Sequence, residues 1–478
     1  MARIAAIGFV GGLAIVLSLP AAGSTFGGGP RWHQPDAGAF ATDREVDYDA
    51  GGAGMLPPLP MRSLPVASAS FESEAVDEES IPPAPLGPLG AQPCRCWRCA
   101  RCCELGDPWR LPQPGFLERR RIAMGGWIQQ GITANALAPD DRFNGPLATN
   151  DRAGEYQLNQ LWLFFDRPVE TGAGWDWGGR VDVIYGTDWR FANSLGLENR
   201  INGAYQLYGM ALPQFYLDVA RNNLTVRLGR WAPSFGHEII PSVANFFYSH
   251  AYGLCYNQPL LVTGVMASYQ LTERWSVKAG THRGSLMFED PNDRWDFLGG
   301  MAWTSPGGGT ELSYHLNHGP RHPFLNDRFV HTFVWRQQLS EDWTYVLQND
   351  LGTERRGDPR GDEHALWYGL TNHLIRQINP RWSAGVRVDF FRDERGAAVA
   401  GCGNAPETFG WDGGPGFAGT FTALTMGLNW RPHANVVLRP EVRWDWYGGS
   451  GDVAGNLPFG DGARSDQFTF ATDLVVTF

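Results

Sequence analysis

The sequence predicts an all-β protein, namely a transmembrane antiparallel β-barrel of about sixteen strands behind a Pro-, Gly- and Cys-rich N-terminal extension. Three observations favour this fold class. From Gly125 to Phe478, apolar and polar residues alternate in segments of about ten to fourteen residues. Short and long connections follow these segments in turn. Sixty glycines, twenty tryptophans and 13% aromatic residues accompany a mean hydropathy of -0.28, which suits a wall with one apolar and one hydrated face.

Residues 1–23 are predicted to be a signal peptide. Arg3 precedes an apolar run from Ile4 to Leu19, and small residues follow at the positions that a signal peptidase reads. An N-terminal membrane anchor is the alternative, although the run is shorter than the roughly 20 residues that a helical span needs.

Residues 24–121 are predicted to form a mostly disordered periplasmic extension, because proline and glycine runs interrupt every possible element. The range 94–103 holds five of the seven cysteines. In an exported protein such clustering favours disulfides, with a small metal site and intermolecular cross-links as alternatives. The other two cysteines, Cys255 and Cys402, fall in separate long connections and can pair only if these connections meet.

The barrel is expected to occupy residues 122–478. Its even number of strands is what closure requires when both termini lie on one side. The predicted strands are 123–135, 155–168, 177–191, 212–222, 223–231, 260–271, 273–282, 295–305, 309–318, 328–340, 341–353, 363–378, 381–393, 417–431, 435–447 and 465–478.

The connections distinguish a membrane barrel from a soluble sandwich. Tight turns such as 222–223, 272–273, 306–308 and 379–380 alternate with long connections such as 136–154, 192–211, 232–259 and 394–416. In an outer-membrane barrel, this alternation assigns the tight turns to the periplasmic rim and the long loops to the outside.

Alternation also separates the two faces of several strands. The residues predicted to point inward into water are Arg180, Asp182, Arg227, Lys278, Arg387, Asp389, Arg439, Glu441, Arg443 and Asp445. Strands 155–168 and 363–378 are apolar on both faces, so that inside and outside cannot be assigned there. Tryptophans at strand starts predict aromatic girdles at the two membrane interfaces.

The chain ends in an alternating strand that closes on Phe478. This ending resembles the C-terminal signal of bacterial outer-membrane proteins, which the barrel-assembly machinery reads. An ordinary edge strand is the alternative.

One long connection, 232–259, is rich in apolar and aromatic residues, whereas exposed loops are normally polar. We expect it to fold into the lumen and narrow the channel. His237 and Glu238 are then its polar groups at the narrowing, facing the wall charges Arg180, Arg227 and Lys278. A loop packed over the mouth or buried at a trimer interface is the alternative.

The same region carries a resemblance to a known family. Leu228-Gly229-Arg230, Phe235-Gly236-His237-Glu238, Asn245 to Ser249, Tyr252, Pro259 and Thr263-Gly264-Val265 resemble the signature of the beta-barrel porin family of bacterial outer membranes called OmpL-like. The similarity covers about Met124 to Phe478 and implies a porin-like barrel in the outer membrane. The extension with its cysteines lies outside it.

Composition and motifs narrow the function. A formal charge of -11 and a pI near 5.5 disfavour nucleic-acid binding. The sequence carries no GxSxG, HExxH or P-loop motif and no Rossmann fingerprint, which requires GxGxxG between a strand and a helix, and we expect neither an enzyme nor a cofactor. The sequence therefore predicts a passive channel for small hydrophilic solutes, surrounded by outer-membrane lipid, with a homotrimer left open. The alternatives are a structural or surface barrel without an open pore, and an outer-membrane hydrolase.

Overall fold

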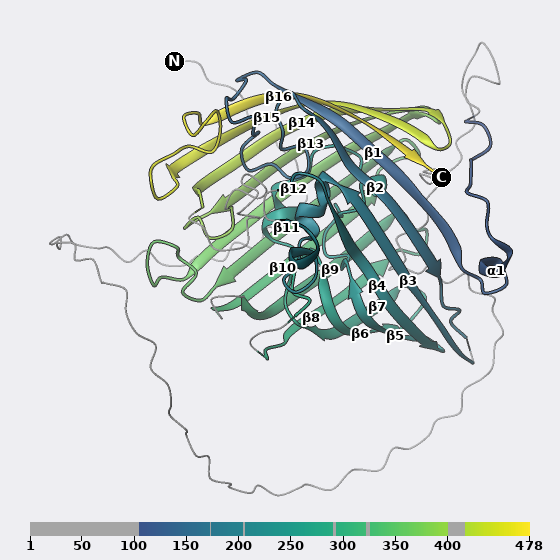
Figure 1. Ribbon diagram of the computed structural model, residues 1–478. Helices are drawn as coiled ribbons and strands as arrows, with labels where there is room; N and C mark the ends of the chain where they lie inside the picture. The colour runs from purple at the N-terminus through teal and green to yellow at the C-terminus, as the bar shows by residue number, and fades with distance from the viewer. Residues whose placement is uncertain (1–104, 173, 204–205, 290–292, 322–325, 400–415) are drawn as a thin grey trace, which may run out of the picture. The chain divides into compact units, whose positions relative to one another are not determined.

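Sixteen antiparallel strands close into a barrel in the computed structural model, which describes residues 105–478 apart from 173, 204–205, 290–292, 322–325 and 400–415 (Figure 1). Each strand pairs with its neighbours in sequence, and β1 pairs with β16 to close the ring. The predicted fold class is confirmed. The predicted signal peptide, the cysteine cluster 94–103 and Cys402 lie outside the described residues.

The strand bounds agree with the sequence expectation to within a few residues at most ends. The strands are β1 (Ala123–Asn135), β2 (Tyr156–Arg167), β3 (Trp175–Gly186), β4 (Gly209–Arg221), β5 (Leu224–Trp231), β6 (Val262–Gln270), β7 (Trp275–His282), β8 (Asp296–Thr304), β9 (Thr310–Arg321), β10 (Asn326–Gln338), β11 (Trp343–Glu354), β12 (Ala365–Asn379), β13 (Trp382–Asp393), β14 (Ala418–His433), β15 (Val436–Gly451) and β16 (Asp466–Thr477).

The predicted third strand is wrong at its end. Residues 187–191 were expected to continue it, but the chain leaves the sheet and forms the 3-10 helix η2 (Thr187–Ala192). The buried carboxylate of Asp188 accepts hydrogen bonds from Asn159 at 2.9 Å and Gln160 at 2.9 Å, both on β2. These bonds hold η2 against the inner wall. The alternation of apolar and polar residues continues past Gly186, so the sequence did not show that the strand ends there.

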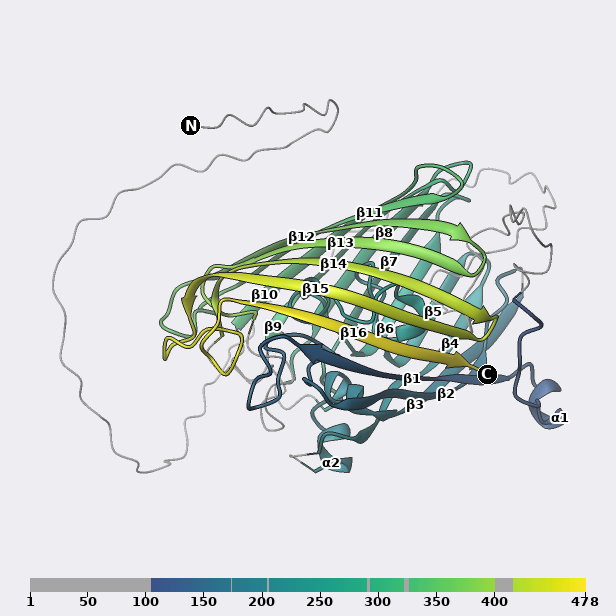
Figure 2. The same cartoon turned by 90° about the horizontal axis from the view of Figure 1, so that it is seen from above.

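Short and long connections alternate around the ring as the sequence predicts, with one exception. The expected long connection 319–327 is wrong, because β9 and β10 stay paired up to Arg321 and Asn326 and only four residues join them. We call the two ends of the barrel the short-turn end and the long-loop end. The C-terminus and the helix α1 (Gly115–Glu118) lie at the short-turn end, and the yellow connection after β15 lies at the opposite end (Figure 2). The connections also contain α2 (Glu198–Ile201), η3 (Ser242–Ala244) and α3 (Tyr252–Tyr256). Within the described ranges, every helix is too short or too polar to cross a membrane.

The two faces of the wall differ as expected from the alternation. On β15, Arg443 is 1% exposed and Asp445 is fully buried, whereas Trp444 between them is 43% exposed and points outward. Arg180, Asp182, Arg227, Arg387 and Asp389 are likewise buried on the inner face. An apolar exterior and a polar interior are the inverse of a soluble fold and suit a barrel embedded in lipid.

Residues 105–121, at the end of the expected extension, pack against the short-turn end. Trp109 stacks on His433 with ring centroids 4.3 Å apart. The Trp109 amide donates to the Asn435 side chain at 2.6 Å, and Asn435 donates back to the Trp109 carbonyl at 3.0 Å. The segment is thereby tied to the β14–β15 turn before the chain enters β1.

Candidate functional site

The connection between β5 and β6, residues 232–261, lies against the inner wall of the barrel. Its groups bond to inward side chains near the middle of several strands. Gln160 of β2 donates to the Ile240 carbonyl at 2.8 Å, and Gln348 of β11 accepts from the His237 amide at 2.7 Å. We call residues 232–261 the internal loop.

One loop carboxylate is central to this attachment. Glu238 is 6% exposed and lies 2.9 Å from the Arg387 guanidinium of β13. It also accepts the Ala251 amide at 2.7 Å and lies 3.3 Å from the Nδ1 of His250. Burial alone would raise the pKa of Glu238, but Arg387 and His250 outweigh it and hold that pKa well below its usual range. Glu238 therefore fastens the internal loop as a buried carboxylate.

Three wall arginines bind the backbone of the internal loop. Their bonds are Arg387 to the Ser249 carbonyl at 2.7 Å, Arg439 to the Ser242 and Asn245 carbonyls at 2.9 and 2.7 Å, and Arg443 to the His250 carbonyl at 2.6 Å. Each arginine also pairs with a strand aspartate, namely Asp389, Asp473 and Asp445 in the same order. These charges are satisfied inside the protein, which fixes the loop instead of leaving the charges to water.

Wall glycines make room for the loop's aromatic rings. A Cβ on Gly385 would lie 2.5 Å from Phe246, one on Gly427 would lie 3.1 Å from Phe247, and one on Gly131 would lie 2.8 Å from Tyr248. The three rings thus seat over positions on β13, β14 and β1 that carry no side chain. The loop and the wall are complementary in shape as well as in charge.

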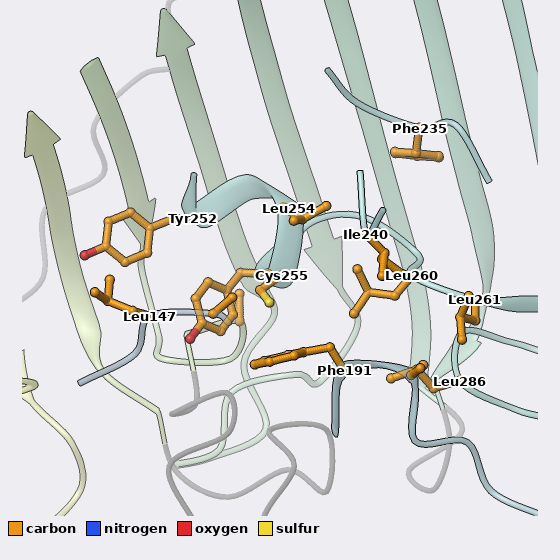
Figure 3. Packing of buried hydrophobic residues seen from close by; sticks show 14 of the residues in the cluster. Leu147, Phe191, Phe235, Ile240, Tyr252, Leu254, Cys255, Leu260, Leu261 and Leu286 are labelled. Atoms are coloured by element: carbon orange, nitrogen blue, oxygen red, sulfur yellow. The ribbon is translucent and has the colours of Figure 1, made fainter. Parts of the chain in front are cut away.

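Apolar residues fill the part of the lumen beside this polar network. Tyr252, Leu254 and Cys255 of α3 pack with Phe191 and Leu286 from other long connections (Figure 3). The cluster extends to Trp162, Trp367 and Phe421 on the inner wall. It accounts for the large inward side chains of Trp162 on β2 and Trp367 on β12, strands whose faces the sequence left unassigned, because these rings pack against protein and not against water.

The inner face of the opposite wall, formed by β6 to β10, is more exposed to solvent than the wall that the internal loop covers. On β6 to β10, the inward residues nearer the short turns are half-buried, namely Ser268, Ser276, Lys278, Glu311, Ser313 and Arg336. The Arg336–Glu311 ion pair spans 2.9 Å with side chains 35% and 40% exposed. The internal loop thus covers one side of the lumen and leaves polar, hydrated side chains on the other.

The structure brings together only part of the predicted site. Lys278 reaches the internal loop, where it donates to the Ser234 carbonyl at 3.2 Å. Arg180 pairs with Asp182 at 2.6 Å, and Arg227 pairs with Asp218 at 2.8 Å, both buried in the wall. Glu238 pairs with Arg387, which the sequence placed inward without linking it to the loop.

His237 of the internal loop lies against β11 and β12. Its ring packs edge-on against His373 with centroids 4.7 Å apart, and Arg336 contributes a repulsive charge. Loss of hydration lowers the pKa of His237 to about 4, so the ring is neutral at physiological pH.

The long-loop rim carries a separate charged cavity of about 620 Å³, lined by residues including Asp358, Arg360 and Glu363. Arg395 lies 3.6 Å from Asp358, and Arg392 lies 2.8 Å from Glu394. Opposite charges are mixed throughout this lining, and it does not select a ligand of one sign.

A closed sixteen-stranded barrel with an apolar exterior, a polar wall and an internal loop defines a porin-like protein of the bacterial outer membrane. The chain belongs to the family described as Putative beta-barrel porin-2, OmpL-like, whose model matches residues 121–478. The resemblance noted in the sequence is confirmed. No curated protein matches the chain.

Several solved structures are similar to this chain. The outer membrane channel DcaP of Acinetobacter baumannii is 11% identical with a TM-score of 0.49, over 75% of this chain and 97% of that one. OmpT, an outer membrane protein of Vibrio cholerae, is 10% identical with a TM-score of 0.48, over 75% and 97%. Pseudomonas putida OprB is 12% identical with a TM-score of 0.48, over 76% and 96%.

Proposed function

We propose that the protein is a narrow passive channel for small hydrophilic solutes, with the internal loop as its constriction. The observation that carries this proposal is the asymmetry of the lumen. The loop is fixed against β11–β16 and β2, while inward Lys278, Glu311 and Arg336 on the other wall remain half-exposed. Solutes would pass between the loop and this hydrated wall.

The constriction we propose is formed by His237 of the internal loop and Lys278 of β7. Glu238 contributes indirectly: its carboxylate forms an ion pair with Arg387 and thereby holds the loop in place. Arg180 and Arg227 lie further along the same inner wall and contribute to the field that an ion meets. Their paired aspartates reduce that field, so we expect only modest ion selectivity.

We propose further that residues 1–23 direct export and are removed, and that the extension to residue 121 lies in the periplasm. The short-turn end is then the periplasmic end. We also propose that Phe478 is the signal that the barrel-assembly machinery reads. Its amide donates to the Gly126 carbonyl at 2.9 Å, so backbone pairing with β1 continues to the last residue.

A barrel without an open pore is the second candidate, and the buried apolar cluster in the lumen favours it. A hydrolase has less support. The hydroxyl of Ser249 is buried and accepts a hydrogen bond from Arg387 at 3.1 Å, and the neighbouring His250 faces Glu238. We therefore propose no catalytic role, and inactivity of the purified protein toward esterase and phospholipase substrates is expected.

Swelling of liposomes that contain the purified protein tests the channel. Small sugars and amino acids are expected to enter at rates that fall steeply with solute size. Equal exclusion of all solutes, in protein that still migrates as a folded barrel before heating, would favour the closed barrel.

A further inference from the structure

Three polar side chains point outward near the middle of adjacent strands. They are His331 of β10, Asn349 of β11 and Asn372 of β12. Their sequence neighbours define the direction. Thr332 donates to Asp350 inside the barrel at 2.6 Å, and His373 approaches the loop carboxylate of Glu238. Because side chains alternate along a strand, residues 331, 349 and 372 face the exterior.

These residues form one surface feature. Asn349 lies opposite Phe333, two residues from His331, and Asn372 lies opposite Leu347, two residues from Asn349. Such diagonal neighbours on one face of a sheet lie about 7–8 Å apart. We call His331, Asn349 and Asn372 the polar stripe. The adjacent strand β13 carries Val386 and Val388 on the same face.

The polar stripe is incompletely hydrogen-bonded. Asn349 donates to the Gly369 carbonyl at 3.1 Å, and Asn372 accepts from the Tyr345 hydroxyl at 2.6 Å. Among the residues that the structure describes, the Oδ1 of Asn349, the Nδ2 of Asn372 and the Nδ1 of His331 have no hydrogen-bond partner. Lipid chains cannot supply one, so unsatisfied groups at this depth are unfavourable.

We propose that the polar stripe is a contact surface for a second copy of this chain. Only another membrane-embedded protein reaches the middle of the bilayer. The stripe offers uncharged donors and acceptors together, which complement groups of the same kind and do not call for a charged partner. Homo-oligomers with closed symmetry are the commonest assemblies. Contact with a second barrel excludes lipid from the stripe and supplies the missing hydrogen bonds.

The test uses the full chain refolded in detergent and measured by size-exclusion chromatography with light scattering. The wild-type protein is expected to be an oligomer. The variant Asn349→Leu/Asn372→Leu is expected to associate at least tenfold more weakly. Each barrel is expected to stay folded, so that its electrophoretic mobility still changes when the sample is heated. The matched control is Thr472→Leu, a polar-to-apolar change at the middle of β16, where the opposite residue Ile132 is exposed.

Three results would overturn the proposal: a monomeric wild type, an oligomer that survives the double substitution, or equal dissociation by Thr472→Leu. If the double variant does not assemble, the single variants Asn349→Leu and Asn372→Leu carry the same test. Conductance per barrel is unaffected in either case, so the outcome is independent of the proposed channel.

Discussion

Replacement of Glu238 by glutamine tests whether the internal loop is fastened by a buried ion pair. Removal of one partner of such a pair costs about 3–5 kcal/mol, because the other charge remains buried. The new side-chain amide would keep an oxygen for the backbone amide of Ala251, and Arg387 would keep Asp389 at 2.9 Å. We therefore expect a loss near the lower end, about 3 kcal/mol in the free energy of unfolding.

The matched control for this change is Glu311→Gln. Glu311 also lies 2.9 Å from an arginine, Arg336, but its side chain is 40% exposed. Exposed pairs contribute about 0–1 kcal/mol, so this variant should unfold almost as the wild type does. Guanidinium titrations of the refolded protein, followed by tryptophan fluorescence, measure both variants. Equal losses for the two glutamates would refute the fastening role of Glu238.

Three further outcomes are expected. The pKa of His237 is about 4 in the folded protein, below the ordinary value near 6.5 of an unfolded chain, so stability should fall as pH drops between these values. His237→Gln should flatten that dependence in guanidinium titrations at pH 7 and pH 4.5, and an unchanged slope would contradict the assignment. Gly385→Leu should displace Phe246 and cost about 1–3 kcal/mol, whereas Gly307→Ala, in open space, should cost little; similar unfolding midpoints for the two would count against the fit of ring to wall. Removal of Phe478 should lower membrane insertion without lowering synthesis, as fractionation and heat-shifted gels would report, and normal assembly would show that the last residue is not needed as a signal.

The strands could be predicted because alternation and connection length are local properties of the sequence. β15 is the clearest case, with Arg439, Glu441, Arg443 and Asp445 inward and apolar residues between them. β2 and β12 could be located but not oriented. Trp162 and Trp367 point inward to the apolar cluster, so apolar residues stand on both faces of these strands for different reasons.

The lumen could be predicted only in part. An aromatic loop between two strands indicates a lumen position, and in the structure His237 of this loop bonds to the wall residue Gln348 while Lys278 of the wall bonds to the loop. The partner of Glu238 could not be found, because Arg387 lies 149 residues away and is one of several inward arginines. The glycines Gly385 and Gly427, which leave room for Phe246 and Phe247, are a signal that reasoning from the sequence missed.

Single-channel recording in a planar bilayer tests the channel most directly. The wild-type protein is expected to give small discrete steps, because among the described residues the internal loop covers one side of the lumen and leaves the wall with Lys278 and Arg336 half-exposed. Deletion of residues 237–250 should enlarge the steps and weaken ion selectivity, since it removes the loop segment that Arg387 and Arg443 hold. Absence of conductance steps would contradict an open pore, provided that the wild-type protein is folded and its gel mobility changes on heating. Steps of unchanged size after the deletion would contradict the loop as the constriction.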